Sequence, residues 1–291
     1  MPPAESTDLR AGIVEVGRRL WARGFVASND GNISVRIAPD RLLMTPASVS
    51  KGFMTAEMMV VTDLEGRVIE AAPGRKPSSE ALMHLVAYQQ RPDIGAVVHA
   101  HPPTATGFAV AGIPLDRAVL AEVVTTLGAI PIADYGTPST RELADAVGPL
   151  LRAHDGVLLA NHGAIALGAD LFSAYYKMET IEHFATISLV ARQLGREHLL
   201  SREEVERLQS LRGTYGIAAP APICPDPAAD GGINDPSCQV VVAPSSSGDR
   251  LVPASTTVAP PLGVGTDGEI RLTYAQLTEL IDEAVRQLAE K

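Results

Sequence analysis

Two histidines separated by one residue, His99 and His101, end an apolar stretch of the sequence. Ala96–Val98 precede them and predict a buried strand, which Pro102 ends. Because residues i and i+2 of a strand point to the same face, both imidazoles can reach one metal ion. The alternative is a pair of histidines at a strand end that only make hydrogen bonds. The spacing alone leaves both interpretations open.

A third histidine, His162, favours the metal interpretation. It follows another apolar run, Val157–Ala160, and precedes Gly163, where the chain can turn away. Three imidazoles around Zn²⁺ leave one coordination position open, which is typical of catalytic rather than structural zinc. The remaining histidines lack this spacing, and we expect no metal role for His84, His154, His183 and His198.

Two hydroxyls and a carboxylate, Ser78, Ser79 and Glu80, stand where a helix to about Gln90 is expected to begin. Hydroxyls and N–H groups at a helix start form an anion pocket suited to phosphate, with Glu80 placed beside it as a base. Taken alone, the same residues could simply cap the helix and compensate its dipole. The polar cluster at 28–32 indicates by itself only a loop.

Periodic segments and short turns alternate from about residue 6 to 216. Leu9, Ile13, Val16 and Leu20 recur at helical spacing and predict a helix over 8–23. The other predicted elements are helices at 78–90, 101–112, 171–194 and 201–213, strands at 33–37, 41–45 and 94–101, a hairpin at 58–70, and two strands within 156–168.

The composition is acidic, with 24 Lys and Arg against 34 Asp and Glu and a net charge of -10. Such a chain has no electrostatic reason to bind nucleic acid or an anionic membrane surface. No apolar run reaches the ~20 residues of a membrane span, and the N-terminus does not resemble a secretory signal. We expect a cytoplasmic protein. Its two cysteines, Cys224 and Cys238, could pair with each other, but the composition favours unpaired thiols.

The composition changes near residue 217. Pro, Ser, Gly and Ala dominate 217–268, which predicts a disordered linker between a domain at 1–216 and a short segment at 269–291. Residues 273–290 predict an amphipathic helix. Its apolar face consists of Leu277, Leu280, Ile281, Ala284, Val285 and Leu288. Such a helix would pack on its own oligomer or bind a partner in a groove.

The sequence resembles the class II aldolase/adducin family over about residues 8–216. The matching motifs occur in family order: GNISVR (31–36), LMTP (43–46), KPSSE (76–80), AVVHAHPP (96–103), NHG (161–163) and TYG (214–216). The resemblance implies an α/β fold of three layers, α/β/α, around a mostly antiparallel sheet. It also implies a homotetramer with active sites between subunits.

The resemblance assigns one zinc ion per subunit to His99, His101 and His162. It makes Glu80 a further ligand or the acid/base. The positions that match phosphate-binding residues of the family are Gly31, Asn32, Ser78 and Ser79. The family's Thr-Gly phosphate pair is Ala47-Ser48 here, so Ser48 is expected to supply that hydroxyl.

Two further catalytic positions follow from the resemblance. Tyr215 matches a C-terminal tyrosine that closes over the aldehyde end of the substrate. The tyrosine acid that the family has near Leu120 is missing. Glu122 can replace it as proton donor only if it turns toward the metal of a neighbouring subunit.

The implied reaction is cleavage of a ketose 1-phosphate, such as L-fuculose 1-phosphate, into dihydroxyacetone phosphate and a short aldehyde such as lactaldehyde. A sugar-phosphate 4-epimerase or decarboxylase of the same superfamily is the alternative, but epimerase relatives tend to carry Asp in place of Glu80. A non-catalytic, adducin-like scaffold is disfavoured because such domains lose the metal histidines.

The predicted C-terminal helix resembles the encapsulation peptides that direct enzymes into bacterial microcompartments. Some of these compartments process fucose and rhamnose, whose aldolase step releases a reactive aldehyde. The resemblance therefore implies a shell protein as partner of residues 269–291.

Overall fold

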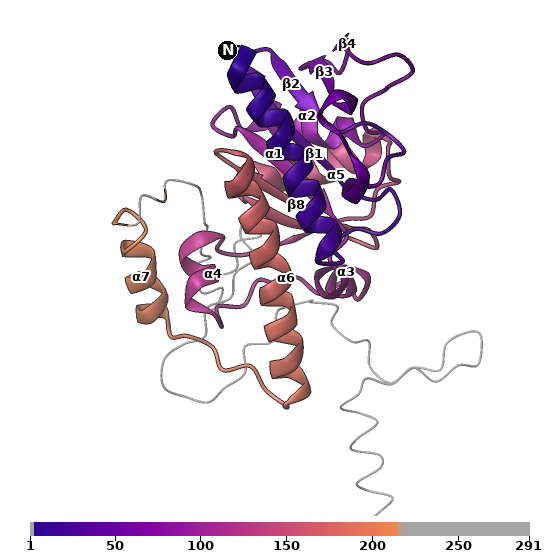
Figure 1. The fold of residues 1–291 in the computed structure, drawn as a ribbon. Coiled ribbons are helices and arrows are strands. Elements are labelled where there is room, and N and C mark those ends of the chain that lie inside the picture. Colours follow the sequence, from indigo (N-terminus) through magenta and orange to yellow (C-terminus); the bar gives the residue numbers. More distant parts are fainter. Residues whose placement is uncertain (1–2, 215–216, 218–291) are drawn as a thin grey trace, which may run out of the picture. The chain divides into compact units, whose positions relative to one another are not determined.

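A computed structural model describes residues 3–214 and 217, which form an α/β fold around one eight-stranded sheet (Figure 1). The strand order is β4-β3-β2-β1-β5-β8-β7-β6, and every neighbouring pair is antiparallel except β6 and β7. The expected mostly antiparallel sheet is thus confirmed. The strands are β1 (Asn32–Ala38), β2 (Arg41–Met44), β3 (Val60–Asp63), β4 (Val68–Glu70), β5 (Ala96–Ala100), β6 (Ile132–Ala133), β7 (Gly156–Leu159) and β8 (Gly163–Gly168).

The helices largely follow the predicted pattern, with some differences at their ends. They are α1 (Pro3–Ala22), α2 (Ala81–Gln90), α3 (Pro103–Val110), α4 (Ala121–Thr126), α5 (Arg141–Leu151), α6 (Leu171–Gln193) and α7 (Arg202–Ser210), with 3₁₀ turns at Lys51–Phe53 and Ala56–Met58. Sequence analysis did not predict α4, α5 or the two-residue strand β6. Helix α4 was missed because it is short and rich in β-branched residues, which have low helix propensity. Helix α5 was missed because it contains Gly148 and Pro149, which disfavour a helix.

Helices cover both faces of the sheet. Neighbouring residues Val97 and Val98 of β5 belong to two different core clusters, since successive side chains of a strand point to opposite faces. One cluster joins the sheet to α1, α3 and α6, and the other joins it to α2 and α5. Figure 1 shows α1 and α6 crossing one face. Strand β5 is therefore buried on both sides, which makes it a rigid support for His99.

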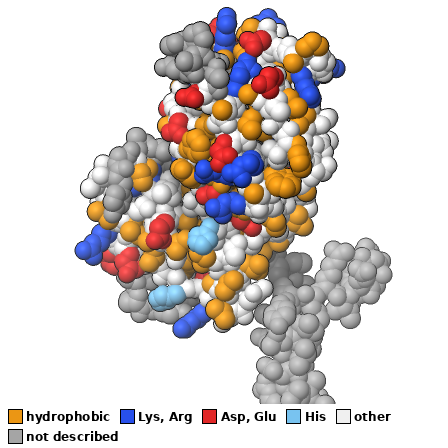
Figure 2. All heavy atoms as spheres, in the orientation of Figure 1, with side chains coloured by type: hydrophobic (Ala, Val, Ile, Leu, Met, Phe, Trp, Pro, Cys, Tyr) orange, Lys and Arg blue, Asp and Glu red, His pale blue; other side chains and the backbone are white. Residues whose placement is uncertain are grey.

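Several predictions fall on residues that the structure does not describe. The linker at 217–268 (apart from Ile217), the helix within 269–291, Tyr215 and both cysteines lie outside the described residues. Among the described helices, none is long and apolar enough to cross a membrane. On the face drawn in Figure 2, basic side chains lie among acidic ones and do not gather into one continuous patch.

Candidate metal and substrate site

The three predicted metal histidines meet at one end of β5. His99 is fully buried on β5, His101 directly follows the strand, and His162 lies in the turn between β7 and β8. Their ring centroids are 4.8–4.9 Å apart, and the candidate ligand atoms all lie within 4.8 Å of one another. Antiparallel pairing of β5 with β8 brings the segment after β7 back to the histidines of β5.

The donor set fits a divalent ion. Nδ1 of His99 lies 2.9 Å from the carbonyl oxygen of Ala164, to which it donates, so Nε2 faces the cluster with a free lone pair. The Nε2 atoms of His99 and His101 are 3.1 Å apart, close to the about 3.3 Å expected between two nitrogens on a tetrahedral zinc. Burial, together with the neighbouring imidazoles, lowers the pKa of His101 to about 4, so this ring is held in its neutral, ligating form.

Glu80 directs its carboxylate into the cluster. It occupies the N-cap position of α2 but makes no side-chain capping hydrogen bond. Its Oε1 lies 3.1 Å from Nε2 of His162, and its Oε2 lies 3.3 Å from Nε2 of His99. Burial opposes ionisation, but the two imidazoles outweigh it and hold the pKa of Glu80 below its ordinary value. The geometry therefore favours a functional carboxylate over a helix cap.

The predicted phosphate residues surround this cluster unevenly. Ser78 is half-buried and its hydroxyl accepts from the N–H of Glu80 at 3.3 Å, while Ser79 is exposed. The side chain of Asn32 is buried and engaged, since its amide nitrogen donates to Oε2 of Glu80 at 2.9 Å. Gly31 has φ +72, and a Cβ there would come within 2.8 Å of the His99 carbonyl oxygen. The chain at residue 31 thus packs directly on the histidine strand.

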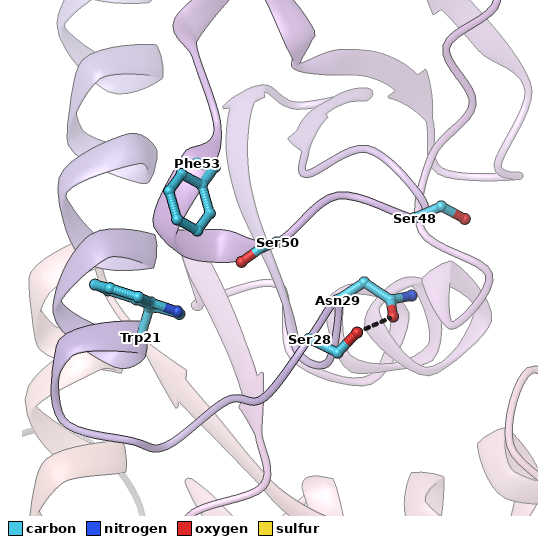
Figure 3. A pocket seen from close by; sticks show the side chains of 6 residues that line it. All are labelled: Trp21, Ser28, Asn29, Ser48, Ser50 and Phe53. Carbon is cyan, nitrogen blue, oxygen red and sulfur yellow. Dashed lines mark hydrogen bonds between the residues drawn. The ribbon is translucent and has the colours of Figure 1, made fainter.

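Ser48 lies on a neighbouring open pocket of about 500 Å³ (Figure 3). This volume is within the range of small-molecule sites. The lining residues are Trp21, Ser28, Asn29, Ser48, Ser50 and Phe53. Trp21 and Phe53 form an edge-on pair with centroids 5.5 Å apart, so the pocket has an aromatic end and a hydroxyl-rich end.

A buried lysine ties the two loops of this pocket together. Nζ of Lys51 donates to the carbonyl oxygens of Asn29 at 3.0 Å and Val49 at 2.6 Å. Burial is the main cause that lowers the pKa of Lys51 from 10.5 to about 8, against the opposing attraction of Asp30 and Glu80. The loop connection therefore carries a cation that is costly to bury.

The cost at Lys51 predicts a pH dependence of stability. Between about pH 8 and 10.5 the unfolded chain binds more protons at this lysine than the folded protein does. The free energy of unfolding of the wild type, measured relative to Lys51→Met, should therefore rise with pH through this window and stay constant below it. Denaturant unfolding of both proteins across the window measures this difference. If the difference in the free energy of unfolding between the two proteins did not change with pH, the lowered pKa of Lys51 would be contradicted.

Gly163 is packed too tightly against His101 to accept a side chain. A Cβ at this position would lie 2.6 Å from the Ala100 carbonyl oxygen and 2.6 Å from Cδ2 of His101. Gly163→Ala should therefore displace the imidazole and weaken zinc binding by about tenfold or more, as measured by competition with a chelator. The matched control is Gly107→Ala in α3, where a Cβ meets nothing within 4 Å. Equal zinc affinity of the two variants would show that the packing at Gly163 does not position His101.

Two predicted catalytic residues do not join the cluster in the described part of the chain. Glu122 is exposed on α4, and its carboxylate makes no hydrogen bond or ion pair with the three histidines or Glu80. Its role across a subunit boundary stays a prediction. Tyr215 lies outside the described residues.

Sequence analysis missed three residues that contact the site. Asp30 lies 3.5 Å from Nδ1 of His101, Lys51 ties the pocket loops, and His84 is bonded to Asn32. The sequence carried a signal for Asp30, which belongs to the polar cluster at 28–32, and for His84, but none for Lys51. His84 stands four residues after Glu80 on a predicted helix and so shares a helix face with it.

Comparison with known proteins agrees with this geometry. Residues 11–189 match the model of the class II aldolase and adducin N-terminal domain. The chain is 35% identical over 209 residues to a 5-deoxy-D-ribulose 1-phosphate aldolase of Bacillus thuringiensis serovar kurstaki, covering 71% of this chain and 96% of the relative. It is 31% identical over 179 residues to a 3-oxo-tetronate 4-phosphate decarboxylase of Haemophilus influenzae, covering 60% of this chain and 84% of the relative.

Solved structures agree as well. The fold superimposes on an L-fuculose 1-phosphate aldolase with a TM-score of 0.65 and 32% identity, covering 70% of this chain and 95% of that one. The family model spans the strands and turns that carry Glu80 and all three histidines. The chain belongs to the class II aldolase/adducin family, as a metal-dependent enzyme of the aldolase kind.

Proposed function

We propose that this enzyme cleaves a ketose 1-phosphate into dihydroxyacetone phosphate and a short aldehyde such as lactaldehyde. The observation that carries the proposal is the placement of Glu80. Its carboxylate lies within 3.3 Å of two of the three clustered imidazoles, so a proton-transfer group adjoins the candidate metal ligands. An aldolase and an L-fuculose 1-phosphate aldolase structure among the relatives support the same reaction.

His99, His101 and His162 are the residues that would hold the ion, with Glu80 as a further ligand or as the acid/base. Zinc suits this set because three imidazoles leave a coordination position open. When bound, the ion supplies positive charge against the negative charge that develops on the substrate oxygens.

The chain's own residues have to move two protons. When the C3–C4 bond breaks, the C4 hydroxyl loses a proton as the aldehyde forms, and C3 must receive one to give dihydroxyacetone phosphate. Glu80 is proposed to carry the proton on the C3 side, because its carboxylate is aimed into the site: it takes a proton from water and delivers it to C3 during cleavage, and it removes that proton in the reverse condensation. Tyr215 is proposed to close over the aldehyde. Glu122 of a neighbouring subunit is proposed to take the proton of the C4 hydroxyl during cleavage and to donate it in the reverse condensation.

Phosphate is proposed to bind where N–H groups and hydroxyls converge at the start of α2. Ser78, Ser79 and Ser48 supply hydroxyls, and Gly31 and Asn32 supply backbone N–H groups. The segment before Ser48 is joined to the segment before α2, since the N–H of Ser78 donates to the Thr45 carbonyl oxygen at 3.1 Å, and this supports the proposal. A homotetramer would bring Tyr215 and Glu122 to a partner's site.

Product analysis with a panel of substrates tests the proposed reaction. Zinc-loaded protein is incubated with L-fuculose 1-phosphate, 5-deoxy-D-ribulose 1-phosphate and 3-oxo-tetronate 4-phosphate. We expect release of dihydroxyacetone phosphate from at least one ketose 1-phosphate. Release of carbon dioxide from the tetronate alone would instead support the decarboxylase suggested by the relative from Haemophilus influenzae. Epimerised ketose without cleavage would identify an epimerase.

We also propose that residues 269–291 form a helix that binds a microcompartment shell protein. The support is the apolar stripe in the sequence of this segment. Deleting 217–291 should leave aldolase activity and oligomeric state unchanged but abolish co-localisation with shell proteins in cells. A truncated protein that unfolds or loses activity would show that the segment belongs to the catalytic body.

A further inference from the structure

A line of buried hydrogen bonds runs from Glu80 away from the histidines. Asn32 donates to Oε2 of Glu80 at 2.9 Å, and its amide oxygen is bonded to Nε2 of His84. Nδ1 of His84 lies 2.7 Å from Oγ of Ser34, which lies 3.0 Å from the hydroxyl of Tyr88. The side chains behind Glu80 are all buried: Asn32, Ser34, His84 and Tyr88.

The spacing of two elements builds this line. Asn32 and Ser34 are i and i+2 on β1 and share a face of the sheet, while Glu80, His84 and Tyr88 follow one another at four-residue intervals along the start and one face of α2. The polar residues on this face of β1 therefore contact the polar residues on the facing side of α2. Buried apolar side chains such as Met44 and Met83 belong to the core on this side of the sheet, so hydroxyl, imidazole and amide groups are costly here unless each is bonded.

The direction of every bond in the line follows from the carboxylate. An ionised Glu80 only accepts, so the NH₂ of Asn32 must face it, and the Asn32 oxygen then faces His84. An amide oxygen only accepts, so Nε2 of His84 carries the hydrogen. Nδ1 then accepts from the hydroxyl of Ser34, which accepts in turn from Tyr88. Burial lowers the pKa of His84 to about 3, in agreement with a neutral ring.

We propose that His84 is a positioning residue, whose Nε2–H fixes the amide of Asn32 so that Glu80 is held toward His99 and His162. If this donor is lost, the Asn32 amide is free to turn its oxygen toward the carboxylate, which repels it. Glu80 then leaves its place beside the two imidazoles. The expected catalytic consequence rests on the proposed aldolase function, whereas the hydrogen-bond order does not.

Two substitutions at His84 separate its two nitrogens. In His84→Gln the side-chain NH₂ overlays Nε2 and keeps the donor to Asn32. In His84→Asn the shorter amide reaches only the place of Nδ1, where its oxygen can accept from the Ser34 hydroxyl, so this contact is kept and the donor to Asn32 is lost. His84→Asn should lower kcat by about 10- to 100-fold with little change in KM, and His84→Gln should retain most of the turnover.

Zinc affinity provides a readout that does not need the reaction. Competition with a chelator should show weaker binding in His84→Asn by about tenfold or more, but not in His84→Gln. The matched control is His154, which is equally buried and bonds through Nδ1 to the carbonyl of Ala129 at 3.1 Å. His154→Asn and His154→Gln report the general effect of shrinking a buried imidazole.

The effects of the two His154 substitutions are first subtracted from those of the corresponding His84 substitutions. The proposal is supported if His84→Asn then shows a loss in turnover or zinc affinity and His84→Gln does not. Equal losses in both His84 variants, or no loss in either, would overturn it. If the wild type bound zinc but cleaved no ketose 1-phosphate, the proposed function would fail, and the chelator experiment would still decide the role of His84.

Discussion

Replacing His162 by alanine should abolish turnover and leave a protein that no longer retains zinc. The candidate ligand atoms of His99, His101 and His162 lie within 4.8 Å of one another, so all three rings could bind the same ion. Two imidazoles hold the ion far more weakly than three. His99→Ala should have the same effect and in addition releases the Ala164 carbonyl from its partner. Metal analysis of purified protein and the cleavage assay measure both losses.

The matched control for these substitutions is His183→Ala. His183 is exposed on α6, so the same change is made outside the cluster. We expect this variant to keep its zinc and its turnover. A His162→Ala protein that retained both zinc and activity would refute the assigned site.

Glu80→Gln should lower turnover by roughly 10²- to 10⁴-fold while the fold and the proposed phosphate pocket persist. The substitution keeps the shape of the side chain and an oxygen that can accept from Asn32. It removes the negative charge beside His99 and His162 and the ability to carry a proton. Because the proposed phosphate-binding groups are untouched, KM should change much less than kcat. Steady-state kinetics of the zinc-loaded variant give both values.

Glu142→Gln is the control that separates the loss of a catalytic carboxylate at Glu80 from the loss of a charge at a helix terminus. Glu142 is also in the first turn of a helix, α5, where its carboxylate accepts from the N–H of Thr137. Its replacement should lower stability slightly and leave the activity unchanged. Near-normal turnover of Glu80→Gln would mean that Glu80 acts only as Glu142 does, at a helix end.

The parts of the site that follow local periodicity could be predicted from the sequence. His99 and His101 stand two residues apart after Ala96–Val98, and the strand, its burial and the shared direction of both imidazoles follow from that pattern. The helix at Leu9–Leu20 could be predicted in the same way. In each case, neighbours along the chain determine the outcome.

The parts that depend on pairing between distant strands could not be predicted. The bond from His99 to Ala164 spans 65 residues, and that from Asn32 to Glu80 spans 48. No local pattern encodes either of them. His84 was given no role because its partners, Asn32 and Ser34, are about 50 residues away on β1. Pairing of β1 with β5 and packing of α2 on that face create the contacts.

Removal and return of the metal tests the central claim, which is carbon–carbon cleavage that depends on an ion held by His99, His101 and His162. The protein is stripped with a chelator, dialysed, and titrated with zinc while release of dihydroxyacetone phosphate from a ketose 1-phosphate is followed. We expect the stripped protein to be inactive and turnover to return linearly until one zinc ion is bound per subunit. Cleavage by fully stripped protein at the rate of the zinc-loaded enzyme would contradict the claim.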